Sequence, residues 1–96
     1  MPLRWPLNHS DDQKPEIIRI KVLNTQVEYI RALPIHESQR EIEITDEWSI
    51  FEYRLVPCYN FYQKLLWNRE KIEVLYPVAV REEMKDILRK MVENYK

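Results

Sequence analysis

The chain of 96 residues contains no glycine. This absence excludes the glycine-rich loops that cradle phosphates and the Rossmann fingerprint, because both need positions without a Cβ atom. Turns and helix ends must instead depend on Asn, Asp and Pro. We therefore expect no nucleotide-binding loop of either kind.

Cysteine and histidine are also scarce. Cys58 is the single cysteine, which excludes an internal disulfide and a cysteine-based zinc cage and is compatible with a reducing cytoplasm. The two histidines, His9 and His36, are too few and too far apart to predict a metal site. We predict no metal and no cofactor.

Neither an excess of one charge nor a long apolar run is present. Fifteen basic residues nearly balance sixteen acidic ones, so we expect no strong autonomous binding to nucleic acid. No stretch reaches membrane-spanning length, and residues 1–7 lack the apolar run of a signal peptide. The sequence predicts a cytoplasmic protein with no membrane partner and one folded domain.

Proline and polar residues dominate residues 1–15, which we interpret as an N-terminal arm or linker before a domain at 16–96. Within the domain, apolar residues recur at the two-residue spacing of strands and at the helical spacing of 3.6 residues. The predicted strands are 18–22, 41–45, 51–55 and 72–76, and the predicted helices are 25–33, 60–68 and 78–95.

Two helix ends carry specific signals. Thr25 with Glu28 three residues later is a capping-box pattern at the start of the first helix. Asn68 is expected to end the second helix, because Asn tolerates the left-handed conformation that often follows a helix. The last helix is the longest, and its apolar residues fall within an arc of about 100°.

The order of elements predicts an α+β fold. It is the ferredoxin-like βαββαβ arrangement, an antiparallel sheet with an additional C-terminal helix. The first and third strands should be central. The sheet face opposite the helices should carry a solvated lattice of ion pairs, formed by Arg19, Lys21, Glu41, Glu43, Glu52 and Arg54.

Three features in this order resemble a known family. They are the stretch His36-Glu37-Ser38-Gln39, the strand end Ile72-Glu73-Val74-Leu75-Tyr76-Pro77 and the long amphipathic C-terminal helix. Together they resemble the C-terminal extension of WYL-domain bacterial transcription regulators, over residues 16–96. One departure is Asn68-Arg69, where the family often has glycine.

The resemblance implies a C-terminal regulatory and oligomerisation module. Such a module would dock against the WYL domain, a second copy of itself, or both. The DNA-binding helices and the WYL domain of these regulators have no counterpart in the sequence, so we expect either a fragment or a stand-alone descendant. A small-molecule or nucleic-acid effector would act through those other domains.

Candidate ligand-binding residues follow from the first of these motifs: His36, Ser38, Gln39 and Arg40. The competing interpretation, which we favour, is that the motif shapes the connection into the second strand by bonding local backbone.

Cys58, His36 and Asp46 include the residue types of nucleophilic catalysis, but no pattern brings them together. We predict that the protein is not an enzyme.

Candidate interface residues are Trp48, Trp67 and Lys64. Trp67 should point roughly 170° away from the apolar centre of its helix, and Trp48 at the hairpin turn is hard to bury.

Three alternative functions stay open. A small-ligand sensor needs a pocket between protomers, an enzyme needs a contact between Cys58 and His36, and direct nucleic-acid binding needs a basic groove.

Overall fold

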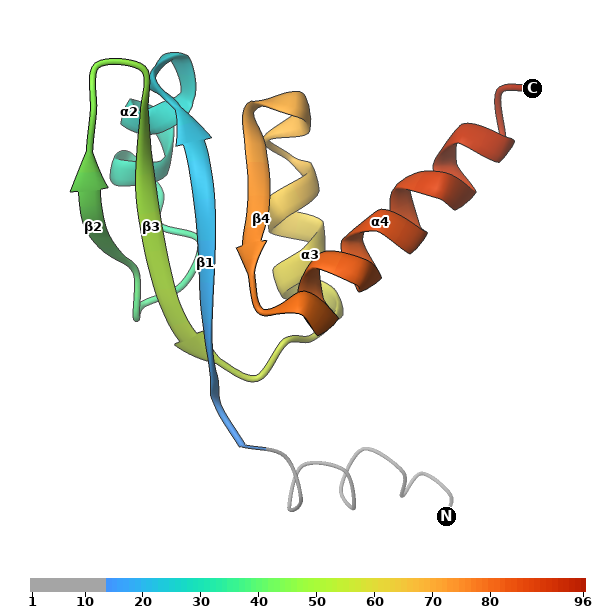
Figure 1. The fold of residues 1–96 in the computed structure, drawn as a ribbon, viewed down its shortest axis with the longest axis horizontal. Coiled ribbons are helices and arrows are strands. Elements are labelled where there is room, and N and C mark those ends of the chain that lie inside the picture. Colours follow the sequence, from blue (N-terminus) through green and yellow to red (C-terminus); the bar gives the residue numbers. More distant parts are fainter. Residues whose placement is uncertain (1–13) are drawn as a thin grey trace.

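The computed structural model describes residues 14–96, so nearly all of the predicted arm at 1–15 lies outside the described residues. Figure 1 shows a four-stranded sheet with helices behind it and one long helix at its side. No helix within the described residues is long and apolar enough to cross a membrane. The elements are β1 (Glu16–Leu23), α2 (Asn24–Ala32), β2 (Arg40–Ile44), β3 (Trp48–Leu55), α3 (Tyr59–Leu66), the 3₁₀ turn η2 (Arg69–Lys71), β4 (Ile72–Tyr76) and α4 (Val78–Glu93).

The sheet has the order β2-β3-β1-β4, with every neighbouring pair antiparallel. The predicted ferredoxin-like fold is therefore confirmed, including the central position of β1 and β3 and the additional C-terminal helix. The register follows from the apolar alternation, since Ile18 pairs with Tyr53 and Ile20 pairs with Phe51. All four side chains are buried on one face of the sheet.

Helices α2 and α3 cover this apolar face (Figure 1). Each contributes two buried residues one turn apart, Val27 and Ile30 from α2 and Phe61 and Leu65 from α3. The Phe61 ring meets Tyr53 edge to face, with ring centroids 5.8 Å apart. This single layer of side chains between sheet and helices is the core.

Strand β2 departs from the predicted alternation. A bulge between Glu41 and Glu43 breaks the register with β3, which leaves Ile42 and Ile44 at 42% and 66% exposure. Glu41 turns toward the helix side and accepts hydrogen bonds from Arg31 of α2 at 2.9 and 2.8 Å. The prediction that Glu41 shares the opposite face is wrong because the bulge reverses its side.

Both predicted helix ends differ in detail. The residue before α2 is Leu23 with no side-chain cap, and the Thr25 hydroxyl instead accepts from Lys71 Nζ at 3.0 Å. Asn68 is buried. Its side-chain Nδ2 donates to the Lys64 carbonyl, and its Oδ1 accepts from the Gln26 side chain. These bonds hold Asn68 at φ −90°, so the left-handed residue is Arg69, with φ 55°.

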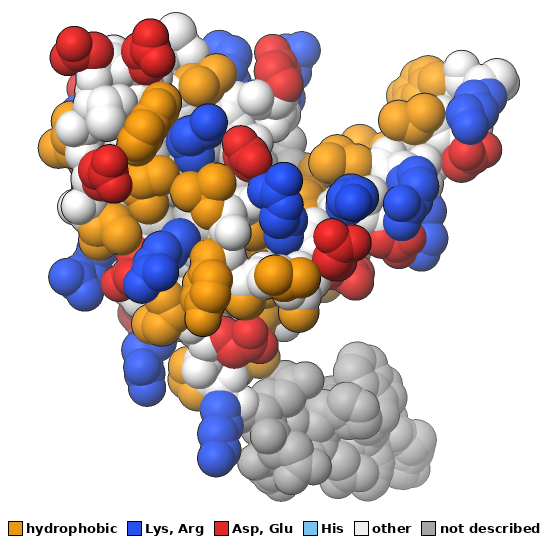
Figure 2. Space-filling model, in the orientation of Figure 1, with side chains coloured by type: hydrophobic (Ala, Val, Ile, Leu, Met, Phe, Trp, Pro, Cys, Tyr) orange, Lys and Arg blue, Asp and Glu red, His pale blue; other side chains and the backbone are white. Residues whose placement is uncertain are grey.

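The other face of the sheet is open and mixes charges with apolar groups, as Figure 2 shows. Arg19 donates to Glu52 at 3.0 Å and lies over the Tyr76 ring, 5.3 Å from its centroid. Lys21 pairs with Glu73 at 3.6 Å. Acidic partners from β3 and β4 thus lie beside both basic groups of β1.

Candidate functional site

The connection between α2 and β2 is held by the amide of Gln39. Its Nε2 donates to the Ile30 carbonyl at 2.9 Å, and its Oε1 accepts from the Ile35 amide at 3.0 Å and the Tyr53 hydroxyl at 2.6 Å. The Gln39 side chain thus joins α2, the connection that follows it, and β3. Gln39 is therefore occupied by structural bonds, as the interpretation based on local backbone bonding predicts.

Ser38 fixes the ring of His36. The Ser38 amide donates to His36 Nδ1 at 3.0 Å, and because an amide can only donate, Nδ1 must be an acceptor. A neutral His36 ring therefore carries its proton on Nε2. The Ser38 hydroxyl lies 2.8 Å from Nδ1 and accepts from the Arg54 amide at 2.9 Å, which joins the connection to β3.

Arg40, the fourth predicted ligand-binding residue, lies apart from this group. Its Nη1 is 3.5 Å from Glu52 Oε1 on the open sheet face, and its side chain is largely exposed. The structure thus divides the predicted set. His36 and Ser38 act together, Gln39 faces the interior, and Arg40 belongs to the ion pairs of the sheet.

A cavity of about 470 Å³ lies beside His36. We call it the His36 cavity. Its floor is apolar, and its rim is polar or basic, with no acidic residue among the lining groups. The apolar lining residues are Pro15, Ile35, Leu55, Val56 and Phe61, and the polar ones are His36, Arg54, Cys58, Asn60 and Lys64.

Cys58 and His36 therefore line one cavity, although no sequence pattern brings them together. No hydrogen bond joins the two side chains within residues 14–96, and Cys58 is exposed at the residue preceding α3. A nucleophile and its base must lie within hydrogen-bond reach. That the protein is not an enzyme stays a prediction.

Trp67 lies on a second concave surface, between α2 and α3. Its side chain is 79% exposed, and Leu33 and Tyr29 of the neighbouring segment are 75% and 67% exposed. These residues, with Lys64, line a groove of about 410 Å³ that we call the α2–α3 groove. The outward position of Trp67 is confirmed. Tyr29 of α2 and Leu33, which directly follows α2, were not singled out from the sequence.

Trp48 lies elsewhere. It pairs with Leu23 at the end of β1 and is only partly exposed, so the sheet accommodates it better than the sequence suggested. Its alternation with the buried Ser49 places it on the face away from α2 and α3. Trp48 and Trp67 therefore cannot belong to one continuous surface.

Helix α4 leaves the body of the domain. Figure 1 shows its first turns beside β4 and its later turns extending outward to the C-terminus. Val80 and Met84 near its start are 3% and 7% exposed, whereas Leu88 and Met91 are each 45% exposed and Tyr95 is 89% exposed. One apolar stripe thus passes from the core into solvent.

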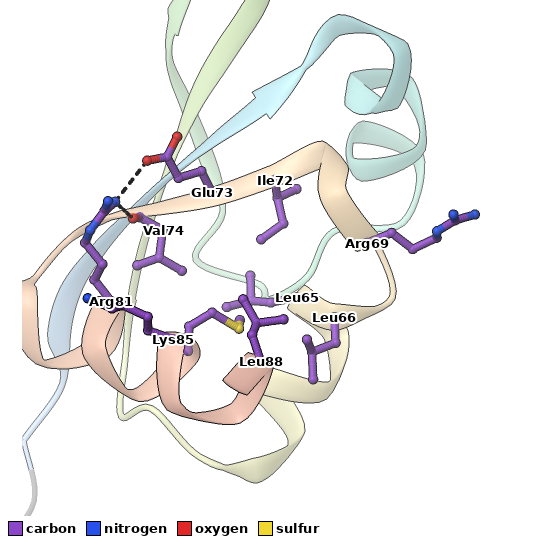
Figure 3. Close-up of a pocket in the computed structure, with 10 residues that line it drawn as sticks. Leu65, Leu66, Arg69, Ile72, Glu73, Val74, Arg81, Lys85 and Leu88 are labelled. Carbon is purple, nitrogen blue, oxygen red and sulfur yellow. Dashed lines mark hydrogen bonds and ion pairs between the residues drawn. The ribbon is translucent and has the colours of Figure 1, made fainter. Parts of the chain in front are cut away.

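A groove of about 200 Å³ opens where α4 departs from α3 and β4. Figure 3 shows Leu88 opposite Leu65 and Leu66 in this α4 groove. Arg81 secures the base of α4, since its Nη1 donates to the Val74 carbonyl at 2.8 Å and to Glu73 at 2.9 Å. The hydrogen bond from Arg81 lowers the pKa of Glu73.

Metal-binding clusters of three or more His, Cys, Asp or Glu residues are absent from the described part of the chain. The concave surfaces considered for function are the His36 cavity, the α2–α3 groove and the α4 groove. The last two expose large apolar groups of the kind that protein interfaces bury.

Comparison with known proteins assigns the family. No curated protein sequence matches the chain at a significant level. The family model of the WCX domain matches residues 14–92, which include every strand and helix described above except the last residue of α4. The chain therefore belongs to the WCX domain family, whose members form the C-terminal extension of WYL-type regulators.

Proposed function

We propose that this WCX domain works as a docking and oligomerisation module, which binds another domain or subunit of a WYL-type regulator through the projecting half of α4. The observation that carries the proposal is the apolar stripe that continues along α4 after the helix has left the core. Binding there would change how the attached domains are presented.

The spacing of the stripe suits a helical partner. Met84, Leu88, Met91 and Tyr95 follow one another at intervals of four, three and four residues, which is the pattern of a helix–helix seam. The α4 groove continues this stripe onto the body through Leu65 and Leu66. A partner helix could therefore contact the stripe and the groove together.

The charged residues of α4 form pairs along the helix itself. Asp86 lies 3.4 Å from Arg89 and 3.1 Å from Lys90, and Lys96 lies 2.8 Å from Glu93. Pairs at these spacings support an exposed helix. They leave the stripe uncharged, which is what an apolar contact requires.

The α2–α3 groove is a separate docking surface. Trp67, Leu33 and Tyr29 surround it, and aromatic anchors of this kind dominate many interfaces. Because it lies between two helices behind the sheet, it can be occupied while α4 is also bound. We propose that a different part of the regulator binds here.

Single charge substitutions in the stripe test the proposal. Leu88→Lys or Met91→Lys should weaken self-association of the full chain, or its binding to the WYL domain of the same regulator, by at least tenfold, because a buried contact becomes an unpaired charge. Sedimentation velocity from micromolar to millimolar concentration measures self-association. Titration calorimetry with the WYL domain measures docking.

Asn94→Lys is the matched control, because it adds the same charge to the same helix outside the stripe. It should leave both measurements unchanged. A native chain that stays monomeric at millimolar concentration and does not bind the WYL domain would contradict the proposal. Equal loss of binding in the control would show that net charge, rather than the stripe, governs association.

A further inference from the structure

The α2–α3 groove has an apolar lining that the described residues leave largely open. Its floor includes Ile30 and Ile35, which are 2% and 5% exposed. Tyr29, Leu33 and Trp67 surround this floor, and their side chains stand mostly in solvent. A single exposed aromatic residue is ordinary, but three large apolar side chains around one concave surface indicate a surface that another segment covers.

The groove adjoins the His36 cavity. Ile35 and Lys64 line both, and Lys64 Nζ donates to the Ile35 carbonyl at 3.3 Å where the two meet. Pro15, which directly precedes β1, also lines the His36 cavity. The two concave surfaces together therefore lead from the start of β1, past Lys64, to Trp67.

Lys64 is the one charged residue that lines the groove. Several lysines in the described part of the chain have a carboxylate partner, as Lys21 has Glu73 and Lys85 has Glu82. Between residues 14 and 96, Lys64 has only the bond to the Ile35 carbonyl. A segment that passes this point is expected to carry negative charge there and apolar side chains beyond it.

The segment at residues 2–7 of this chain has the apolar pattern that the groove requires. Leu3, Trp5 and Leu7 recur at two-residue spacing, and side chains at this spacing share one side of an extended chain. The two prolines of the segment restrict its backbone, which lowers the entropy lost on binding. Grooves lined by aromatic residues bind proline-containing segments in this way.

The residues between this segment and β1 supply the negative charge. Asp11 and Asp12 follow the apolar stretch and precede Pro15 by only a few residues. Counted back from Pro15, the chain presents an acidic pair first and large apolar side chains second. The surface presents Lys64 first and the apolar groove second, so the two orders match.

The length of the segment is sufficient. The far end of the groove is lined by Gln26 in the first turn of α2, which directly follows β1 (Figure 1). The eight residues of β1 span roughly 26 Å, which is the distance to cover from Pro15. Leu7 lies eight residues before Pro15, and an extended chain of that length reaches roughly 26–29 Å. Residues 2–7 can therefore lie anywhere along the groove.

We propose that residues 2–7 of this chain bind in its α2–α3 groove, with Trp5 against Trp67 and the acidic pair against Lys64. The inference rests on the proposed docking role of this groove and names its occupant. Any other part of the regulator that docks in the groove has to displace the segment. The segment therefore competes with such a partner and sets a threshold for its binding.

Paramagnetic relaxation in the full chain tests the contact. A nitroxide is attached at Asn8→Cys in a Cys58→Ser background, because Cys58 is the single cysteine and is exposed. It should broaden the amide signal of Leu33 and the indole signal of Trp67, and leave the last turn of α4 sharp. Trp5→Ala in the same labelled chain should largely remove the broadening, because the anchor is lost.

A mixed sample separates binding within one chain from binding between two chains. It combines spin-labelled chains with unlabelled chains that carry the observed isotope. Binding within one chain gives no broadening in this sample. Broadening in the mixture as strong as in the single-chain experiment would assign the groove to the segment of a second copy and overturn the proposal.

A synthetic peptide of residues 1–13 measures the affinity of the groove. Its binding to the full chain carrying Trp5→Ala, whose own segment lacks the anchor, is measured by calorimetry. Adding Trp67→Ala should weaken this binding by about tenfold or more, and adding Lys64→Gln by about threefold, because the ion pair is exposed. Tyr95→Ala removes an equally exposed aromatic residue from α4 and should leave the affinity unchanged. Thermal melts report folding of each variant separately.

Three further results would overturn the inference: no broadening at the groove, broadening that survives Trp5→Ala, or equal peptide affinities of the Trp67→Ala and Tyr95→Ala chains. The docking role of the groove is tested separately with the WYL domain. If Trp67→Ala weakens binding of that domain but not of the peptide, the groove docks another part of the regulator. If it weakens neither, the proposed docking role of the groove is wrong as well.

Discussion

The two halves of α4 have the same apolar periodicity and opposite surroundings. In the first half, Val80 and Met84 are almost fully buried in the core cluster, which also contains Leu65 of α3 and Val74 of β4. In the second half, Leu88, Met91 and Tyr95 continue the stripe with nothing from the described residues covering the end of it. Periodicity fixes which face of a helix is apolar, and it does not say what covers that face.

The polar contacts of α4 follow the same division. Arg81 at the base bonds to β4 through a backbone carbonyl and a carboxylate, so it attaches the helix to the sheet. Asp86, further along, bonds only within the helix, to Arg89 and Lys90. The first half of α4 is therefore part of the domain, and the second half is available to a partner.

Two methionines on α4, one in each half, should show the largest difference in stability when they are replaced. Met84→Ala should lower the free energy of unfolding by about 2 kcal/mol or more, because it leaves a cavity in the packed half. Met91→Ala should change it by less than about 0.5 kcal/mol, because the side chain is half-exposed. Urea unfolding monitored by circular dichroism measures both. Equal losses would mean that the projecting half folds back onto the body.

The two tryptophans extend the comparison to the rest of the molecule. Trp67→Ala should leave thermal stability nearly unchanged and cost about 2 kcal/mol or more of docking free energy if Trp67 is an interface anchor. Trp48→Ala should lower the melting temperature, because Trp48 is partly buried on the sheet. Light scattering with size exclusion, together with thermal melts, separates the two effects. Unfolding of Trp67→Ala would show that this residue supports the core.

Replacing single acidic residues should have the smallest effect on the free energy of unfolding. Hydrogen bonds from Arg31, and then from Ser49, lower the pKa of Glu41. A folded-state pKa below the unfolded one stabilises the protein above the unfolded pKa, and this contribution is lost as pH falls through the folded pKa. Glu41→Gln should therefore cost about 1 kcal/mol at neutral pH, a figure already reduced for solvent screening, and almost nothing in strong acid.

Asp86→Asn is the matched substitution on the projecting half of α4. A hydrogen bond from Lys90 lowers the pKa of Asp86, but the pair is exposed to solvent and screened. We expect no measurable change in stability between neutral pH and acid in physiological salt. Unfolding curves recorded across this pH range measure both variants. A pH-dependent loss as large as that of Glu41→Gln would mean that Asp86 contacts more than its own helix.

Only part of the His36 cavity could be predicted. The sequence motif singled out His36 and Ser38, whose bonds are local. Lys64 of α3 lines the same cavity only because α3 packs against the sheet, and Arg54 of β3 contacts the motif through its backbone amide, which donates to Ser38. Arg54 was assigned to the lattice of ion pairs on the open sheet face, but no carboxylate of that face reaches it in the described residues.

The sequence by itself determined the strand and helix order, the central position of β1 and β3, and the apolar face of each helix. These follow from residue spacing, which the backbone geometry of strands and helices translates directly into faces. Tertiary structure alone decided the bulge that turns Glu41 toward Arg31, the shift of the left-handed residue from Asn68 to Arg69, and the departure of α4 from the core. Each depends on contacts between segments distant in the chain, and local spacing carries no information about them.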